Sequence, residues 1–208
     1  MNFWKQLTIK SKVIAIMILI TAITSGAAFY QLNISIKELK EQKLTELTVL
    51  SGKLDHSIQA QFYERYGDVQ AFALNDALTS KSKSEITEIL NSYSALYGIY
   101  DLIIYTDTKG RFIASNSKAP DGKNLNLEKL ISHDFKNETW FKSAMEQKWT
   151  SDKSKGFDNT FVEDAFIDPM VSAVYAENRW GNSFTTVVKN SSGEIKGVVT
   201  ARAGFRWV

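Results

Sequence analysis

Residues 183–205 read SFTTVVKNSSGEIKGVVTARAGF, and this stretch decides the fold class. Its two halves are rich in Val, Thr and Phe, which favour β-strands, and they flank the turn-forming sequence Asn190-Ser-Ser-Gly193. Two strand-like runs on either side of such a turn predict a β-hairpin. The predicted strands lie at 183–189 and 195–205.

A second hairpin is predicted earlier in the chain. Tyr100-Asp-Leu-Ile-Ile-Tyr-Thr106 has strand composition, and the turn Asp107-Thr-Lys-Gly110 leads into Arg111-Phe-Ile-Ala-Ser115. A helix with Ser84 as its N-cap and Gly98 at its end precedes this hairpin. Further helical patterns between the hairpins lie at 127–131 and 139–147. A small antiparallel sheet flanked by helices is an α+β fold.

A long helix is predicted before the sheet. Residues 33–78 contain no Pro, and their apolar side chains recur at helical steps, at Leu44, Leu47, Leu50, Leu54, Ile58, Phe62, Tyr66, Val69 and Phe72. At about 1.5 Å per residue, about 45 helical residues extend roughly 65 Å. The stripe either packs against its own domain or pairs with a second copy. Residues 34–50 favour a second copy, because a domain that begins later has too little bulk to bury them. We therefore expect a homodimer.

Residues 13–32, VIAIMILITAITSGAAFYQL, carry no charge. About 20 apolar residues in a helix span the hydrocarbon core of a bilayer, so this segment predicts a transmembrane helix in the inner (cytoplasmic) membrane. The leader at 1–12 is basic and holds no acid, which predicts a cytoplasmic N-terminus and a periplasmic or extracellular domain beyond the span. A cleaved secretory signal is the alternative, with an apolar core at 13–23 and small residues at 25–28. Both interpretations export the same domain.

The composition argues against several classes of function. The chain of 208 residues has 25 basic and 23 acidic residues, and its net charge of +2 gives no electrostatic case for nucleic acid. It has no Cys, so its folding depends on an apolar core. His56 and His133, its two histidines, have no neighbours at ligand spacing. Neither a metal site nor a cofactor is predicted.

Four stretches resemble motifs of one protein family. They are RYGDVQAFALN at 65–75, TWFKSAM at 139–145, VEDAFIDPMV at 162–171 with the following Val174-Tyr175, and GEIKGVV at 193–199. In this order they resemble the Cache family, the PAS-like extracellular sensor domains of bacterial methyl-accepting chemotaxis proteins and related receptors. The resemblance covers nearly all of the exported part, and one predicted sheet fits the single-Cache form. It implies that 33–78 form a stalk helix belonging to the sensor and that 79–208 form the ligand-binding domain.

The resemblance implies a small-molecule pocket between the sheet and the helices and loops that cover it. The candidate ligand-binding residues are Tyr105, Trp140, Phe141, Asp168, Tyr175, Arg179, Phe184 and Arg202. Asp168, Tyr175 and Arg179 are expected in or beside a loop that closes the pocket. Core packing is the alternative for Trp140, Phe141 and Phe184, and a local turn before Pro169 is the alternative for Asp168.

Arg202 interrupts an otherwise apolar strand. Period two places it on the face of Val198 and Thr200, and if that face covers the pocket, its guanidinium can hold a carboxylate. If the face meets solvent, Arg202 is a surface residue. Amino-acid-binding members of the family carry an Arg two residues before the Trp-aromatic pair, where this chain has Glu138. An organic acid, an amino acid, an amine attracted to the acidic segment 163–168, or no small ligand remain open.

The sequence favours a sensory input module rather than an enzyme, in which ligand binding shifts the long helix. Catalysis by the acids of 163–168 is disfavoured because no Ser, Cys or His has a recognisable nucleophile setting. The alternatives are an input domain of a histidine kinase or diguanylate cyclase, and an anchored interaction module without a small ligand. The given sequence stops at Trp207-Val208, after the last predicted strand. We expect the cytoplasmic signalling module in a longer receptor or in a partner protein.

Overall fold

The computed structural model describes residues 8–205, without the side chain of Lys155. The start of the predicted leader, at 1–7, and the dipeptide Trp207-Val208 lie outside the described residues. The chain divides into two compact units, Met1–His56 and Ser57–Val208.

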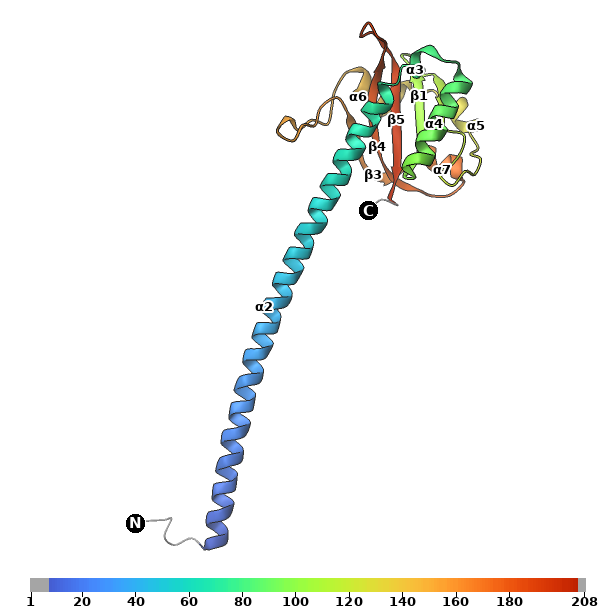
Figure 1. The fold of residues 1–208 in the computed structure, drawn as a ribbon. Helices are drawn as coiled ribbons and strands as arrows, with labels where there is room; N and C mark the ends of the chain where they lie inside the picture. The colour runs from blue at the N-terminus through green and yellow to red at the C-terminus, as the bar shows by residue number, and fades with distance from the viewer. Residues whose placement is uncertain (1–7, 206–208) are drawn as a thin grey trace. The chain divides into compact units, whose positions relative to one another are not determined.

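Residues 9–56 of the first unit belong to one helix, α2 (Ile9–Ala73), which is labelled in Figure 1. An 18-residue window of this helix has a mean hydropathy of 2.1, and none of the window is buried. By length and composition the helix can cross a membrane. The predicted span at 13–32 is helical throughout.

The second unit contains one antiparallel sheet of five strands in the order β2-β1-β5-β4-β3 (Figure 1). The strands are β1 (Tyr100–Asp107), β2 (Phe112–Ser115), β3 (Phe161–Ile167), β4 (Trp180–Lys189) and β5 (Ile195–Gly204). β1 and β2 form one predicted hairpin, β4 and β5 form the other, and β1 pairs with β5. Gly110 and Gly193 close the two turns with φ of 76° and 80°, in the left-handed region that glycine tolerates. The α+β fold with one antiparallel sheet is therefore confirmed.

Helices cover both faces of this sheet. The α-helices after α2 are α3 (Ala77–Ser80), α4 (Lys83–Tyr97), α5 (Glu128–Ile131), α6 (Thr139–Met145) and α7 (Pro169–Tyr175). Two short 3-10 helices accompany them, η1 (Phe135–Asn137) and η2 (Lys153–Lys155). The helices predicted at 127–131 and 139–147 are confirmed as α5 and α6, with slightly shorter bounds.

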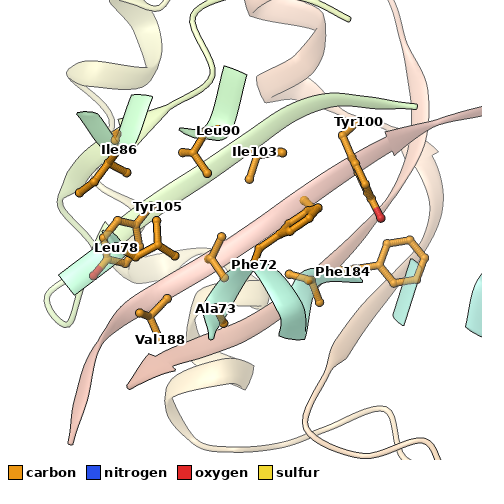
Figure 2. Packing of buried hydrophobic residues seen from close by; sticks show 14 of the residues in the cluster. Phe72, Ala73, Leu78, Ile86, Leu90, Tyr100, Ile103, Tyr105, Phe184 and Val188 are labelled. Atoms are coloured by element: carbon orange, nitrogen blue, oxygen red, sulfur yellow. The ribbon is translucent and has the colours of Figure 1, made fainter. Parts of the chain in front are cut away.

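Each face of the sheet carries its own hydrophobic cluster, because alternate residues of a strand point to opposite faces. On the face that we call the α4 face, Phe72 of α2 and Leu90 of α4 pack with Ile103, Tyr105 and Phe184 of the sheet (Figure 2). The opposite face, the α6 face, is covered by α5, α6 and α7. Its cluster includes Leu102, Ile104, Leu130, Phe135, Trp140, Phe141, Val171, Val174 and Val198.

The C-terminal end of α2 differs from the prediction. The helix ends at Ala73 rather than near Leu78. The reason is a turn at Asn75, whose Oδ1 accepts a hydrogen bond from the backbone N–H of Ala77 at 3.0 Å. Asn side chains that bond to the backbone two residues later stabilise turns in place of helix.

The start of α4 also differs. Its N-cap is Ser82, not Ser84. Ser82 Oγ accepts a hydrogen bond from Glu85 N at 3.4 Å, and Glu85 Oε2 accepts one from Ser82 N at 3.1 Å. This reciprocal capping box satisfies two backbone donors. Ser84 cannot form one, because the residue three positions later is Thr87 rather than Glu or Gln. The predicted end is confirmed, because Gly98 is the C-cap with φ of 72°.

The sequence does not predict strand β3. Glu163 and Asp164 interrupt its apolar pattern, and its register with β4 shifts between Glu163 and Phe166. As an edge strand it pairs on one side only. Asp168 and Arg179 lie in the short irregular segments on either side of α7, and Tyr175 is the last residue of that helix, so all three lie in or beside a loop as expected.

Candidate functional site

Arg202 lies at the centre of a buried charged cluster on the α6 face. Its Nη1 donates hydrogen bonds to Asp168 Oδ2 at 3.0 Å and to Glu163 Oε2 at 3.2 Å. Arg202 is 3% exposed and Asp168 is 2% exposed, so these charges are shielded from bulk water. The predicted face is confirmed, and its surface alternative is excluded. We call Arg202, Asp168, Glu163 and Ser183 the arginine cluster.

Strand pairing and a helix cap place these groups. Glu163 of β3 pairs with Ser183 of β4, and Ser183 pairs with Arg202 of β5, so the three residues form one row across the sheet. Ser183 Oγ donates a hydrogen bond to Glu163 Oε2 at 2.6 Å. Asp168 is the N-cap of α7, and its Oδ1 accepts two backbone hydrogen bonds of that helix at 2.8 and 3.1 Å. Its Oδ2 is thereby directed to Arg202.

Trp140 of α6 packs over the arginine cluster. The centroid of its ring lies 5.3 Å from Arg202 Cζ, within the range of a cation–π contact. One guanidinium faces two carboxylates, so the cluster carries one excess negative charge when all three groups are ionised. Arg202 Nε has no hydrogen-bond partner among the described residues. The cluster therefore retains both an excess negative charge and an unused donor.

A second ion pair adjoins the cluster. Arg179 Nη1 donates to Asp101 Oδ1 at 3.1 Å, and Asp101 is 3% exposed. The Arg179 guanidinium carbon lies 3.8 Å from the centroid of the Tyr175 ring, and Tyr175 Oη donates to the backbone oxygen of Asp101 at 3.1 Å. The space between this pair and Arg202 is too narrow to admit a water molecule. The site is closed, and a ligand at Arg202 requires local movement of α7 or of the segment after it.

The eight candidate residues divide between the two faces of the sheet. Trp140, Asp168 and Arg202 meet in the arginine cluster. Tyr175 and Arg179 meet at the adjoining Asp101 pair, and Phe141 packs near Trp140 with 6.0 Å between ring centroids. Tyr105 and Phe184 belong to the core of the α4 face and are not brought to these residues (Figure 2).

Three residues of the site are missing from the sequence-based set. Glu163 is singled out only as part of an acidic segment, because the strand that orients it is not predicted. Ser183 and Asp101 are buried polar residues in β-strands. A polar residue at an inward position of a strand is the signal that indicates them, by the same period-two argument that places Arg202.

A further buried network joins α2 to the sheet within the second unit. Asp68 Oδ2 accepts hydrogen bonds from Arg65 Nε at 2.9 Å and from Tyr100 Oη at 2.6 Å. Burial, reinforced by the hydrogen bond to Asp68, raises the pKa of the Tyr100 hydroxyl far above its usual value. Tyr100 therefore stays neutral and continues to donate to Asp68. Because β1 carries Tyr100 and pairs with β5, this network links α2 to the strand of Arg202.

In fold, the chain is similar to the ligand-binding domains of bacterial chemoreceptors. No family model and no curated protein match the sequence. Among solved structures, the ligand-binding domain of the Campylobacter jejuni chemoreceptor Tlp3, in complex with 4-methylisoleucine, matches 72% of this chain and 53% of that chain, with 14% identity and a TM-score of 0.50. At this identity the likeness concerns the fold only.

Two other structures are similar at lower scores. The domain of the Pseudomonas aeruginosa amino acid chemoreceptor PctC in complex with GABA has 16% identity and a TM-score of 0.49, covering 72% of this chain and 58% of that chain. The domain of Pseudomonas fluorescens CtaA with L-serine has 15% identity and a TM-score of 0.46, covering 71% of this chain and 52% of that chain. This chain therefore spans little more than half of the structures it matches. The Cache subtype stays a prediction.

Proposed function

We propose that the chain is the extracytoplasmic small-molecule sensing module of a transmembrane chemoreceptor, anchored by α2 with its N-terminus in the cytoplasm. The observation that carries the proposal is the arginine cluster: a buried guanidinium shared by two carboxylates and covered by Trp140. It lies inside a fold shared with a chemoreceptor domain that was solved with a small ligand.

The charge of the site indicates the ligand class. A carboxylate ligand adds a third negative charge around Arg202, whereas an ammonium group neutralises the excess negative charge of Glu163 and Asp168. The ligand that fits best is therefore an amine or an amino acid whose ammonium group meets these carboxylates. An amino acid additionally presents a carboxylate to Arg202 Nε.

The signal follows from population shift. A ligand at the closed site favours a state in which α7 has moved, by as much as its affinities for the two states differ. β5 transmits that change to β1, and the Tyr100–Asp68–Arg65 network transmits it to α2. α2 is the element that leads toward the membrane in this proposal.

A thermal-shift screen of the full chain in detergent tests the proposal. Aliphatic primary amines and aliphatic amino acids are expected to raise the melting temperature by roughly 5–10 °C at about 100 times their Kd, and simple carboxylates are not. The shift is expected to vanish in Glu163→Gln. Asp121→Asn is the matched control, because this acidic side chain is exposed and remote from the cluster. Stabilisation by carboxylates alone contradicts the ligand class, and a panel without any hit contradicts the sensor proposal.

The exposed stripe of α2 supports the homodimer as part of the same proposal. Leu44, Leu47 and Leu54 are 65%, 61% and 56% exposed. Leu47→Cys is expected to give disulfide-linked dimers under mild oxidation, because parallel helices that meet along this stripe bring the two sulfur atoms together. The chain has no Cys of its own, so only the introduced cysteine can form a disulfide. Thr45→Cys, about 160° around the helix from Leu47, is the control. Equal crosslinking at both positions, or none at Leu47, contradicts the seam.

A further inference from the structure

A cleft of about 400 Å³ opens on the α4 face, on the other side of the sheet from the arginine cluster. Phe62 and Tyr66 of α2 form one wall, and Val162 of β3 and Asn182 of β4 form another. Asn182 directly precedes Ser183 in β4, so their side chains point to opposite faces of the sheet. The volume lies in the range of small-molecule sites.

Aromatic rings dominate the apolar lining of the cleft. Phe157, from the segment after α6, packs edge-on against Tyr66 with 4.7 Å between ring centroids. Phe62 lies on the border of the core, with its ring 5.9 Å from Phe184. The cleft is thus framed by three rings from two parts of the chain that lie far apart in sequence. Three aromatic side chains in this arrangement can pack against a flat apolar ring of a ligand.

The polar lining of the cleft is acidic. Asp152 and Asp164 both line it, and none of the described lining residues is Lys or Arg. Asn182 is 2% exposed, and its Oδ1 is buried without a hydrogen-bond partner among the described residues. An unpaired buried amide oxygen is costly, and a nearby donor that reaches it removes the cost. The polar groups therefore favour a ligand that carries positive charge and N–H donors.

We propose that this cleft is a second binding site, for a small aromatic amine, with the ring between Phe62, Tyr66 and Phe157 and the ammonium group toward Asp152 and Asp164. The site is distinct from the arginine cluster because the sheet separates the two. It does not depend on the function proposed for that cluster.

The hydrogen bonds of Tyr66 connect the lining of the cleft directly to α2. Tyr66 Oη donates to the backbone oxygen of Thr150 at 2.9 Å and accepts from Thr160 N at 3.2 Å. Gln70, one turn later, donates to the backbone oxygen of Asp158 at 2.7 Å. The last turns of α2 are therefore tied to the segment that carries Phe157. A ligand bound between α2 and this segment therefore changes the packing of α2 directly, and the sheet does not have to transmit the change.

Isothermal titration of the full chain in detergent with phenethylamine tests the site. Binding is expected, with 2-phenylethanol and phenylacetate at least about 10-fold weaker because one lacks the positive charge and the other carries a negative one. The double variant Asp152→Asn/Asp164→Asn is expected to weaken phenethylamine by about 3–10-fold, since partly exposed charges contribute modestly. Phe62→Leu, which keeps an apolar side chain at the core border, is expected to weaken it by a similar factor.

The controls separate this site from the arginine cluster. Asp121→Asn removes an exposed carboxylate elsewhere and is expected to leave phenethylamine binding unchanged. Loss of binding in Glu163→Gln, with full binding in Asp152→Asn/Asp164→Asn, overturns the cleft proposal and assigns the amine to the arginine cluster. No binding of phenethylamine to the wild-type chain also overturns it, and neither result bears on amines or amino acids that fit the cluster alone. Equal affinity for phenethylamine and 2-phenylethanol contradicts the role of the carboxylates.

Discussion

Arg202→Met is expected to lower the free energy of unfolding by about 3–5 kcal/mol, because removal of the cation leaves the buried carboxylate of Asp168 and the partly buried carboxylate of Glu163 without their counter-charge. Met preserves most of the apolar volume of the arginine stem, so the loss reports charge rather than a cavity. Asp168 is held by the N-terminus of α7 and cannot turn away from the site without giving up two backbone hydrogen bonds. Chemical denaturation of the full chain in detergent, followed by circular dichroism, measures the effect.

The triple variant Arg202→Met/Asp168→Asn/Glu163→Gln is the matched control. It removes the anions together with the cation, and Asn at position 168 still serves as an N-cap. It is expected to be more stable than Arg202→Met alone, since an uncharged site of similar volume replaces a broken ion network. A single variant within about 1 kcal/mol of the wild type contradicts the network, because solvent-exposed ion pairs give losses of that size.

The sheet is predictable because its signals are local. Each hairpin is encoded by a turn and the strand-like runs beside it, and Gly110 and Gly193 sit where the turns require them. The face of Arg202 follows from period two within one strand. The end of α2 and the start of α4, which differ from the prediction, are decided by side-chain bonds to the backbone at Asn75 and Ser82, for which more than one nearby residue is chemically suitable.

The site is less predictable because its partners come from distant parts of the chain. Asp168 and Glu163 lie 34 and 39 residues from Arg202 in sequence. Their contact with Arg202 depends on β3, an edge strand whose acidic residues make its sequence resemble that of a loop. Tyr105 and Phe184 are aromatic residues of the kind that line ligand pockets, but their strand positions direct them into the core of the α4 face. An aromatic residue in a strand has the same signature whether it faces a ligand or a core.

Trp140→Ala is expected to cost about 3–5 kcal/mol of unfolding free energy, because Trp140 is a fully buried residue and its removal leaves a cavity beside Arg202. Free indole is expected to restore part of this loss by filling the cavity, as apolar cavities in proteins take up small apolar molecules. At about ten times its Kd, indole recovers about 1.4 kcal/mol by mass action. The measurement is the melting temperature of the variant with and without indole.

Leu102→Ala is the control for this rescue. Leu102 is also fully buried on the α6 face, and the smaller cavity that it leaves does not admit an indole ring. Rescue of Trp140→Ala but not of Leu102→Ala shows that a molecule from solution reaches the space beside Arg202 while the domain stays folded, which is what a ligand at this closed site requires. A destabilised Trp140→Ala variant that indole does not rescue argues that α6 and α7 do not open, and then Arg202 has a structural role only.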